Sequence, residues 1–182
     1  MNHTGTQYIE TDRLILRRFE QSDAQAMFGN WASDDEVTKY LVWPTHGNVS
    51  VTEQIVEEWV SRYSEKEFYQ WAIVLKDNGP EPIGGISVVN WKNGEIPEIG
   101  YCMGRRWWHR GIMTEALGAV IDFLFDRVGV QRIIARHDVN NPHSGGVMRK
   151  CGMKFEGIRE KSDRNNQGVC DAAHYSIECG DR

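Results

Sequence analysis

The sequence predicts an α+β fold built around one mixed β-sheet. Segments with the two-residue periodicity of strands and segments with helical periodicity alternate in the order β-α-α-β-β-β-α-β-α-β-β. A chain of 182 residues suits one domain with a sizeable core. No internal repeat, low-complexity tract or flexible linker divides the chain. We therefore expect residues 1–182 to form a single domain.

The first half of the chain supplies most of the expected strands. Residues 13–19 (RLILRRF) alternate apolar and polar side chains, which indicates a strand. Capping-box signatures at Ser22 with Gln25, and at Ser50 with Glu53, precede apolar residues at helical spacing and predict two early helices. Turn-forming residues then separate three more segments with strand character, at 71–76, 83–90 and 98–103.

The second half begins with a long predicted helix, residues 111–128, with an apolar stripe at helical spacing. A strand is expected at 132–139. Asn141 as N-cap and Pro142 as the first helical residue predict a short helix that Gly152 ends. Two final strands, near 153–160 and 169–178, complete the sheet.

The composition is that of a globular protein, with 40% hydrophobic and 26% charged residues. No apolar run approaches the roughly 18 residues typical of a membrane span, and the N-terminus lacks a signal-peptide core. The four cysteines are scattered, which favours a reducing, cytoplasmic location. Histidines and cysteines show no metal-ligand spacing, so no metal is expected. A net charge of −5 argues against general attraction to nucleic acid.

The most distinctive stretch is RRWWHRGIMTEA, residues 105–116, which joins a predicted strand to the long helix. A helix N-terminus points free backbone N–H groups at one spot, and Arg105, Arg106 and Arg110 add positive charge. This pattern fits an anion site, a nucleic-acid contact or an ordinary solvated turn. The stretch lacks the spacing of a P-loop or of a dinucleotide-binding loop.

Four segments in a fixed order carry a resemblance to a known family. They are ETDRLILRRFEQSDAQAMF (10–28), EIGYCM (98–103), WHRGIMTEAL (108–117), and the pattern Asn-x-x-Ser-x-x-Val-x-x-Lys-x-Gly over 141–152. Together they resemble the GNAT N-acetyltransferases, and within them the RimJ/RimL-like group. The resemblance implies a mixed, mostly antiparallel sheet of about seven strands, flanked by about four helices, with splayed central strands.

The resemblance also implies acetyl-CoA as co-substrate. Its pyrophosphate would be held by the backbone amides of His109, Arg110, Gly111, Ile112, Met113 and Thr114. Its pantetheine arm would pair with backbone groups of Tyr101, Cys102 and Met103, and would contact Asn141. His109 stands where the family often has glycine, so its side chain either faces a phosphate or points into solvent.

Acetyl transfer to an amine requires a base and a proton donor for the leaving thiolate. Glu98 is the candidate base; the alternative is a surface glutamate at a sheet edge. Many family members carry a tyrosine as the acid, but the matching residue here is Met148, so Ser144 is the candidate, with Tyr175 less favoured. A first-turn helix serine is the alternative for Ser144. Cys102 is expected to be a buried strand cysteine rather than an acyl carrier.

The resulting hypothesis is an acetyl-CoA-dependent N-acetyltransferase that works by direct transfer. The acceptor is a primary amine: a protein N-terminus, including a ribosomal one, or a small amine such as an amino acid, a polyamine or an antibiotic. A homodimer is left open, and neither membrane nor nucleic acid is expected as a partner. The alternative is a non-catalytic module that binds coenzyme A. Trp31, Trp59 and Tyr63 are expected in the core, near an acceptor pocket. The loop 43–48 either helps to shape that pocket or is irregular surface coil.

Overall fold

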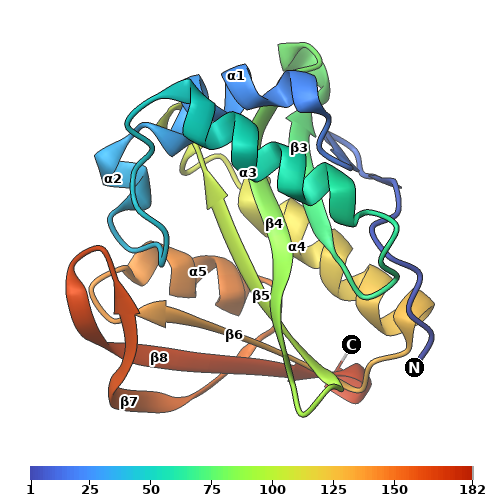
Figure 1. The fold of residues 1–182 in the computed structure, drawn as a ribbon. Helices are drawn as coiled ribbons and strands as arrows, with labels where there is room; N and C mark the ends of the chain where they lie inside the picture. Colours follow the sequence, from blue (N-terminus) through green and yellow to red (C-terminus); the bar gives the residue numbers. More distant parts are fainter. Residues whose placement is uncertain (182) are drawn as a thin grey trace.

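The structure, a computed structural model, describes residues 1–181. Over these residues one sheet has eight strands in the order β1-β2-β3-β4-β5-β6-β8-β7 (Figure 1). The strands are β1 (Ile9–Glu10), β2 (Leu14–Arg17), β3 (Gln70–Leu75), β4 (Pro82–Lys92), β5 (Ile96–Met103), β6 (Arg132–Asp138), β7 (Lys154–Asn165) and β8 (Gly168–Glu178). The α-helices are α1 (Ala24–Met27), α2 (Asp35–Thr38), α3 (Val49–Arg62), α4 (Ile112–Phe123) and α5 (Pro142–Lys150).

The sheet is antiparallel except between β5 and β6. These two strands run parallel and share one register pair, Glu98 opposite Ile134. Beyond this pair the strands diverge, and Figure 1 shows them opening as a V in front of α5. The predicted α+β class, with one mixed sheet and splayed central strands, is confirmed.

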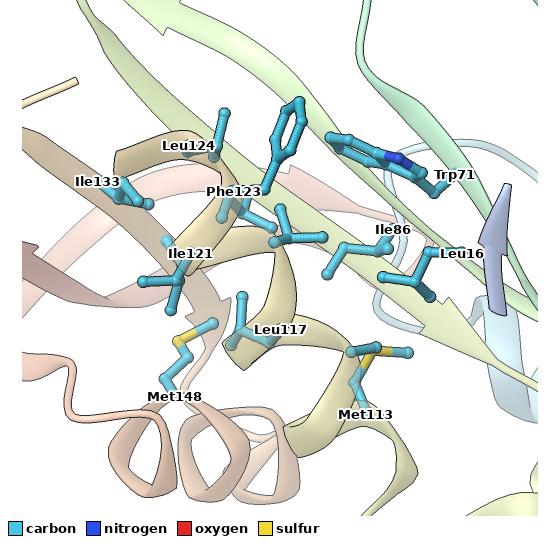
Figure 2. Packing of buried hydrophobic residues seen from close by; sticks show 14 of the residues in the cluster. Leu16, Trp71, Ile86, Met113, Leu117, Ile121, Phe123, Leu124, Ile133 and Met148 are labelled. Atoms are coloured by element: carbon cyan, nitrogen blue, oxygen red, sulfur yellow. The ribbon is translucent and has the colours of Figure 1, made fainter. Parts of the chain in front are cut away.

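Helices cover both faces of the sheet and bury two apolar clusters. On one face α4 packs Leu117 and Phe123 against Trp71 and Ile86 of the sheet, with Met148 of α5 beside them (Figure 2). The whole predicted stripe of α4 is buried: Met113, Ala116, Leu117, Val120, Phe123 and Leu124. On the other face α1 and α3 close a second cluster that includes the predicted core residues Trp31 and Tyr63.

The structure differs from the sequence prediction mainly at element ends and in short elements. The short strand β1 and the single-turn helix α2 were not predicted, because two to four residues carry no readable periodicity. Glu20, not Ser22, caps the first helical turn and forms a capping box with Asp23. The N-cap of α3 is Asn48 in extended conformation, whose side chain accepts from the amide of Ser50. The predicted cap at Ser50 is therefore wrong by two residues.

Around α5 the prediction holds better. Pro142 is the first helical residue, and Gly152, at φ +80°, follows the end of the helix. Asn141 occupies the N-cap position, but its side chain makes no capping hydrogen bond. Within the described residues, no helix has the length and apolarity needed to cross a membrane.

Candidate active site

The turn between β5 and α4 is fixed from inside by its tryptophans. Trp107 is buried under Gly104, where a Cβ would come within 2.7 Å of the indole ring. The indole N–H of Trp108 donates to the carbonyl of Met103 over 2.7 Å. Arg105, which the sequence offered as a cation for an anion site, is paired with Asp34 at 2.6 Å. The two tryptophans therefore shape the turn, and Trp108 also lines a cavity beside it.

Two residues of the turn adopt left-handed backbone conformation, His109 at φ +60° and Gly111 at φ +71°. A left-handed residue without a Cβ is the least strained, which explains why the family often has glycine at the position of His109. Arg13 holds this backbone in place by donating to the carbonyl of Arg110 at 3.0 Å. Arg13 also pairs with Glu115 in the first turn of α4 at 2.6 Å.

The backbone amides from His109 to Thr114 converge at the start of α4. Within residues 1–181 none of them donates a hydrogen bond to another protein atom, and the first helical bond is from Glu115 to Gly111. Free amides at a helix N-terminus stabilise a bound anion. The site therefore fits a phosphate-bearing ligand, and its recognition is by backbone rather than by side chain.

A cavity of about 860 Å³ lies against this turn, between β5 and α5. Its walls include every residue that the resemblance assigns to the cofactor: Tyr101, Cys102, Met103, His109, Arg110, Gly111, Ile112, Met113, Thr114 and Asn141. Sequence reasoning missed the further cations of this wall, Lys39, Arg149 and Lys150. It also missed His143, whose ring lies edge-on to that of His109 with centroids 4.8 Å apart. We call this space the donor cavity.

A second cavity, of about 370 Å³, lies on the opposite side of β5 and is called the acceptor cavity. Glu98, Gly100 and Cys102, which share one face of β5, are on its wall. The two cavities share lining residues at the splay, including Tyr101, Cys102, Asn141 and Ser144. A ligand in each cavity would therefore meet at this point.

Glu98 is 6% exposed and lies at the vertex of the splay, so the alternative of a surface glutamate is wrong. Its carboxylate forms an ion pair with Arg136 of β6. The guanidinium of Arg136 also pairs with Asp163 of β7 at 2.7 Å. Sequence reasoning found neither partner, because they come from strands far along the chain.

Ser144 of α5 faces the side chain of Tyr101. The Tyr101 hydroxyl lies 3.0 Å from the Ser144 Oγ and donates to the Ser144 carbonyl at 3.0 Å. Burial raises the pKa of Tyr101 well above its usual value, so the hydroxyl keeps its proton. The sequence had assigned only the backbone of Tyr101 a role.

The other candidate groups have different surroundings. Tyr175 is buried in the core, lines neither cavity, and its hydroxyl accepts from Arg149 at 2.8 Å. Burial raises the pKa of the Cys102 thiol to about 12, which disfavours the thiolate that a covalent route needs. In the described part of the chain, no three His, Cys, Asp or Glu residues cluster as metal ligands.

The fold and site together offer two cavities that meet at a splayed strand, one of them beside free backbone amides that suit a phosphate-bearing ligand. Comparison with known proteins gives its family. A family model described as "Acetyltransferase (GNAT) domain" matches residues 13–154. The chain belongs to the GNAT acetyltransferases and, within them, to the RimJ/RimL-like group. It is an N-acetyltransferase that uses acetyl-CoA.

Two curated relatives cover most of the chain. An uncharacterised N-acetyltransferase of Bacillus subtilis (strain 168), YoaA, is 31% identical over 171 residues, which are 93% of this chain and 95% of the relative. The [ribosomal protein uS5]-alanine N-acetyltransferase of Escherichia coli (strain K12) is 34% identical over 157 residues, 82% and 79% of the two chains.

Solved structures agree on the fold. A GNAT-family acetyltransferase from Bacillus anthracis superposes with a TM-score of 0.83 at 26% identity, over 96% of this chain and 99% of that one. RimL, a ribosomal L7/L12 α-N-protein acetyltransferase solved with coenzyme A, gives a TM-score of 0.83 at 20% identity, over 94% and 98% of the two chains.

Proposed function

We propose that this protein moves the acetyl group of acetyl-CoA directly to a primary amine, with Glu98 as the base and the Ser144–Tyr101 pair as the proton donor. The observation that carries the proposal is the common wall of the two cavities. Glu98 lines the acceptor cavity, and Ser144 and Tyr101 line both. A base and a donor of protons thus lie on either side of the point where an amine and a thioester would meet.

The donor cavity suits acetyl-CoA in charge and shape. In this proposal the amides from His109 to Thr114 hold the pyrophosphate, and Arg110 and Lys150 supply countercharge to the nucleotide end. The edge of β5 that faces the splay pairs with the pantetheine amides at Tyr101 and Cys102, as an added strand would. The Met103 carbonyl already accepts a hydrogen bond from Trp108, so it contributes less to this pairing.

The residues in the splay can balance the protons of the reaction. An amine arrives as an ammonium ion, and Glu98 takes one proton, directly or through water, so that the nitrogen can attack the thioester carbonyl. The carbon–sulfur bond then breaks, and the thiolate takes a proton from the Ser144 Oγ, which lies 3.0 Å from the Tyr101 hydroxyl. The second proton of the attacking nitrogen passes through water to that serine oxygen, and Glu98 releases its proton to solvent, so both residues end as they began. Arg136 forms an ion pair with Glu98 in the free enzyme.

Replacing Glu98 with Gln tests the proposal. We expect kcat/KM for an amine to fall by about 100-fold or more, while the dissociation constant for acetyl-CoA stays unchanged. Glu95→Gln is the matched control, because Glu95 is exposed in the β4–β5 turn and lines neither cavity.

Thiol release and direct binding separate the possible outcomes. A Glu98→Gln enzyme with the full rate and the wild-type pH profile would place the base elsewhere. Wild-type protein that binds acetyl-CoA but releases no thiol with any amine in a broad panel would instead be a coenzyme A-binding module.

A further inference from the structure

The outer wall of the acceptor cavity is aromatic. It is built by Phe19 after β2, Trp31 after α1, Tyr40 and Trp43 after α2, and Trp59 of α3. Trp59 stacks at a tilt on Phe19 with ring centroids 4.9 Å apart, and Phe19 contacts Trp31 at 6.4 Å. A volume of about 370 Å³ lies at the small end of the range of about 300–1,000 Å³ for small-molecule sites. This wall fits a compact apolar group.

The inner wall of the acceptor cavity carries excess negative charge. Its carboxylates are Glu98, Asp138 and Asp163, and its only Arg or Lys among the described lining residues is Arg136. His137 also lines the wall, but burial lowers its pKa, so its ring is neutral near pH 7. The wall therefore attracts an ammonium ion and repels an anion.

Arg136 is already occupied by protein carboxylates. Its Nη1 faces Glu98, and its Nε and Nη2 face the two oxygens of Asp163 at 2.7 and 3.4 Å. An incoming carboxylate would have to displace one of these partners, and would then lie beside it with like charge. Like charges placed side by side in a binding site cost several kcal/mol.

Asn166, at the tip of the β7–β8 hairpin, binds the segment that supplies Leu41 and Trp43 to the wall of the acceptor cavity. Its side-chain amide donates to the carbonyls of Thr38 and Trp43, each at 2.8 Å. Its backbone N–H donates to the carbonyl of Leu41 at 3.2 Å. The hairpin tip is thereby joined to the loop after α2, which lies beside it in Figure 1. These contacts fix the position of two residues of the cavity wall, Leu41 and Trp43.

We infer that the acceptor is a compact primary amine with an apolar body and no carboxylate group, rather than a free amino acid or the N-terminus of a protein. The inference rests on the proposed function and names its substrate class. The aromatic wall takes the apolar body, and the carboxylates draw in the ammonium ion. The carboxylates that occupy Arg136 disfavour free amino acids, and the small volume of the cavity disfavours polypeptides.

A matched set of acceptors tests the inference: 2-phenylethylamine, phenylalanine, phenylalaninamide, spermidine and a ten-residue peptide that begins with alanine. We expect kcat/KM to be highest for 2-phenylethylamine. Phenylalaninamide has the size of phenylalanine without its negative charge. Its kcat/KM should exceed that of phenylalanine by roughly 100-fold. A higher kcat/KM for phenylalanine, spermidine or the peptide than for 2-phenylethylamine would overturn the inference and leave the proposed function standing.

Asp163→Asn tests the role assigned to Arg136. The substitution keeps the shape of the side chain but removes a negative charge, and so frees guanidinium N–H groups for an incoming carboxylate. The preference for phenylalaninamide over phenylalanine should then fall by about ten-fold. Asp77→Asn is the control for net charge, because Asp77 is exposed and lines neither cavity, and it should leave the preference unchanged.

The outcomes distinguish the inference from the function on which it rests. An unchanged preference in a folded Asp163→Asn enzyme, with wild-type affinity for acetyl-CoA, would overturn the assignment of charge selection to Arg136. Absence of thiol release with every amine, despite acetyl-CoA binding, would overturn the proposed function itself.

Discussion

Replacing Gly111 with alanine adds a single methyl group and should weaken cofactor binding without a steric clash in the fold. Gly111 precedes α4 at φ +71°, in the middle of the free amides. A Cβ placed there would meet only the Arg13 Nη2, at 3.6 Å, which is an ordinary contact. Gly111→Ala therefore introduces no clash, and its cost is that of holding an L-residue in left-handed conformation, about 1–2 kcal/mol.

This cost appears in binding because the amides converge only while residue 111 stays left-handed. If alanine shifts the turn toward other backbone conformations, the binding-competent fraction falls, and the apparent dissociation constant rises in proportion. If the whole cost of about 1–2 kcal/mol appears in binding, the affinity for coenzyme A falls by roughly 5- to 30-fold. Gly111→Asp should weaken binding further, because it adds a negative charge beside the phosphates.

Gly118 in the same helix provides the matched control. A Cβ at Gly118 meets nothing within 4 Å, and its backbone is helical, so Gly118→Ala should stabilise the protein by about 0.5–1 kcal/mol. Urea unfolding measures stability, and isothermal titration with coenzyme A measures affinity. Wild-type affinity in Gly111→Ala would refute the reasoning that these amides hold the pyrophosphate.

Two further predictions concern the donor side of the site. Ser144→Ala should slow thiol release in a single turnover by about 100-fold with little change in acetyl-CoA affinity. Tyr101→Phe should slow it less, because the tyrosine only positions the serine hydroxyl. Equal rates for wild type and Ser144→Ala would remove serine from the mechanism. Burial raises the pKa of Glu115, but hydrogen bonds from Thr11 and Arg13 outweigh it and hold the folded pKa below the ordinary 4.5. The stability contributed by Glu115 is therefore complete above that value and lost as pH falls through the folded pKa. Glu115→Gln should weaken this loss of stability at low pH, as measured by urea unfolding across pH. An unchanged dependence of the unfolding free energy on pH would contradict the hydrogen bonds from Arg13 and Thr11 as its cause.

The donor half of the site was readable from the sequence because it is local. Nearly all of the donor half lies within residues 98–117, which form a strand, a turn and the first turns of a helix. Free amides at a helix N-terminus need no particular side chain. The sequence could not predict the backbone conformation that directs the amides of this turn toward one site. The left-handed backbone of His109 and the hold of Arg13, about a hundred positions earlier in the chain, depend on tertiary contacts.

The acceptor half was largely unreadable for the opposite reason. Glu98, Arg136 and Asp163 come from three strands, and nothing in the spacing of an arginine and two acids indicates that they will form one network. The contact of Asn166 joins a hairpin tip to a loop more than a hundred residues earlier. Alternation did place Glu98 on the cavity wall, because that rule needs only the strand to which the residue belongs.

The divergence of β5 and β6 explains why the donor and acceptor halves of the candidate site meet beside Glu98. Strand β5 is paired with β4 along its length, but with β6 only at Glu98 and Ile134, so the peptide groups from Tyr101 onward face the opening. Buried peptide groups need hydrogen-bond partners, and a ligand that carries amides can supply them. On the other side of the vertex, Arg136 projects from β6 where the strands begin to part, and its ion pair with Glu98 spans them. In the proposed mechanism, one departure from regular pairing thus provides both a free edge for the donor and a charged vertex for the acceptor, and it brings the proposed reacting groups together without any motif that joins them in sequence.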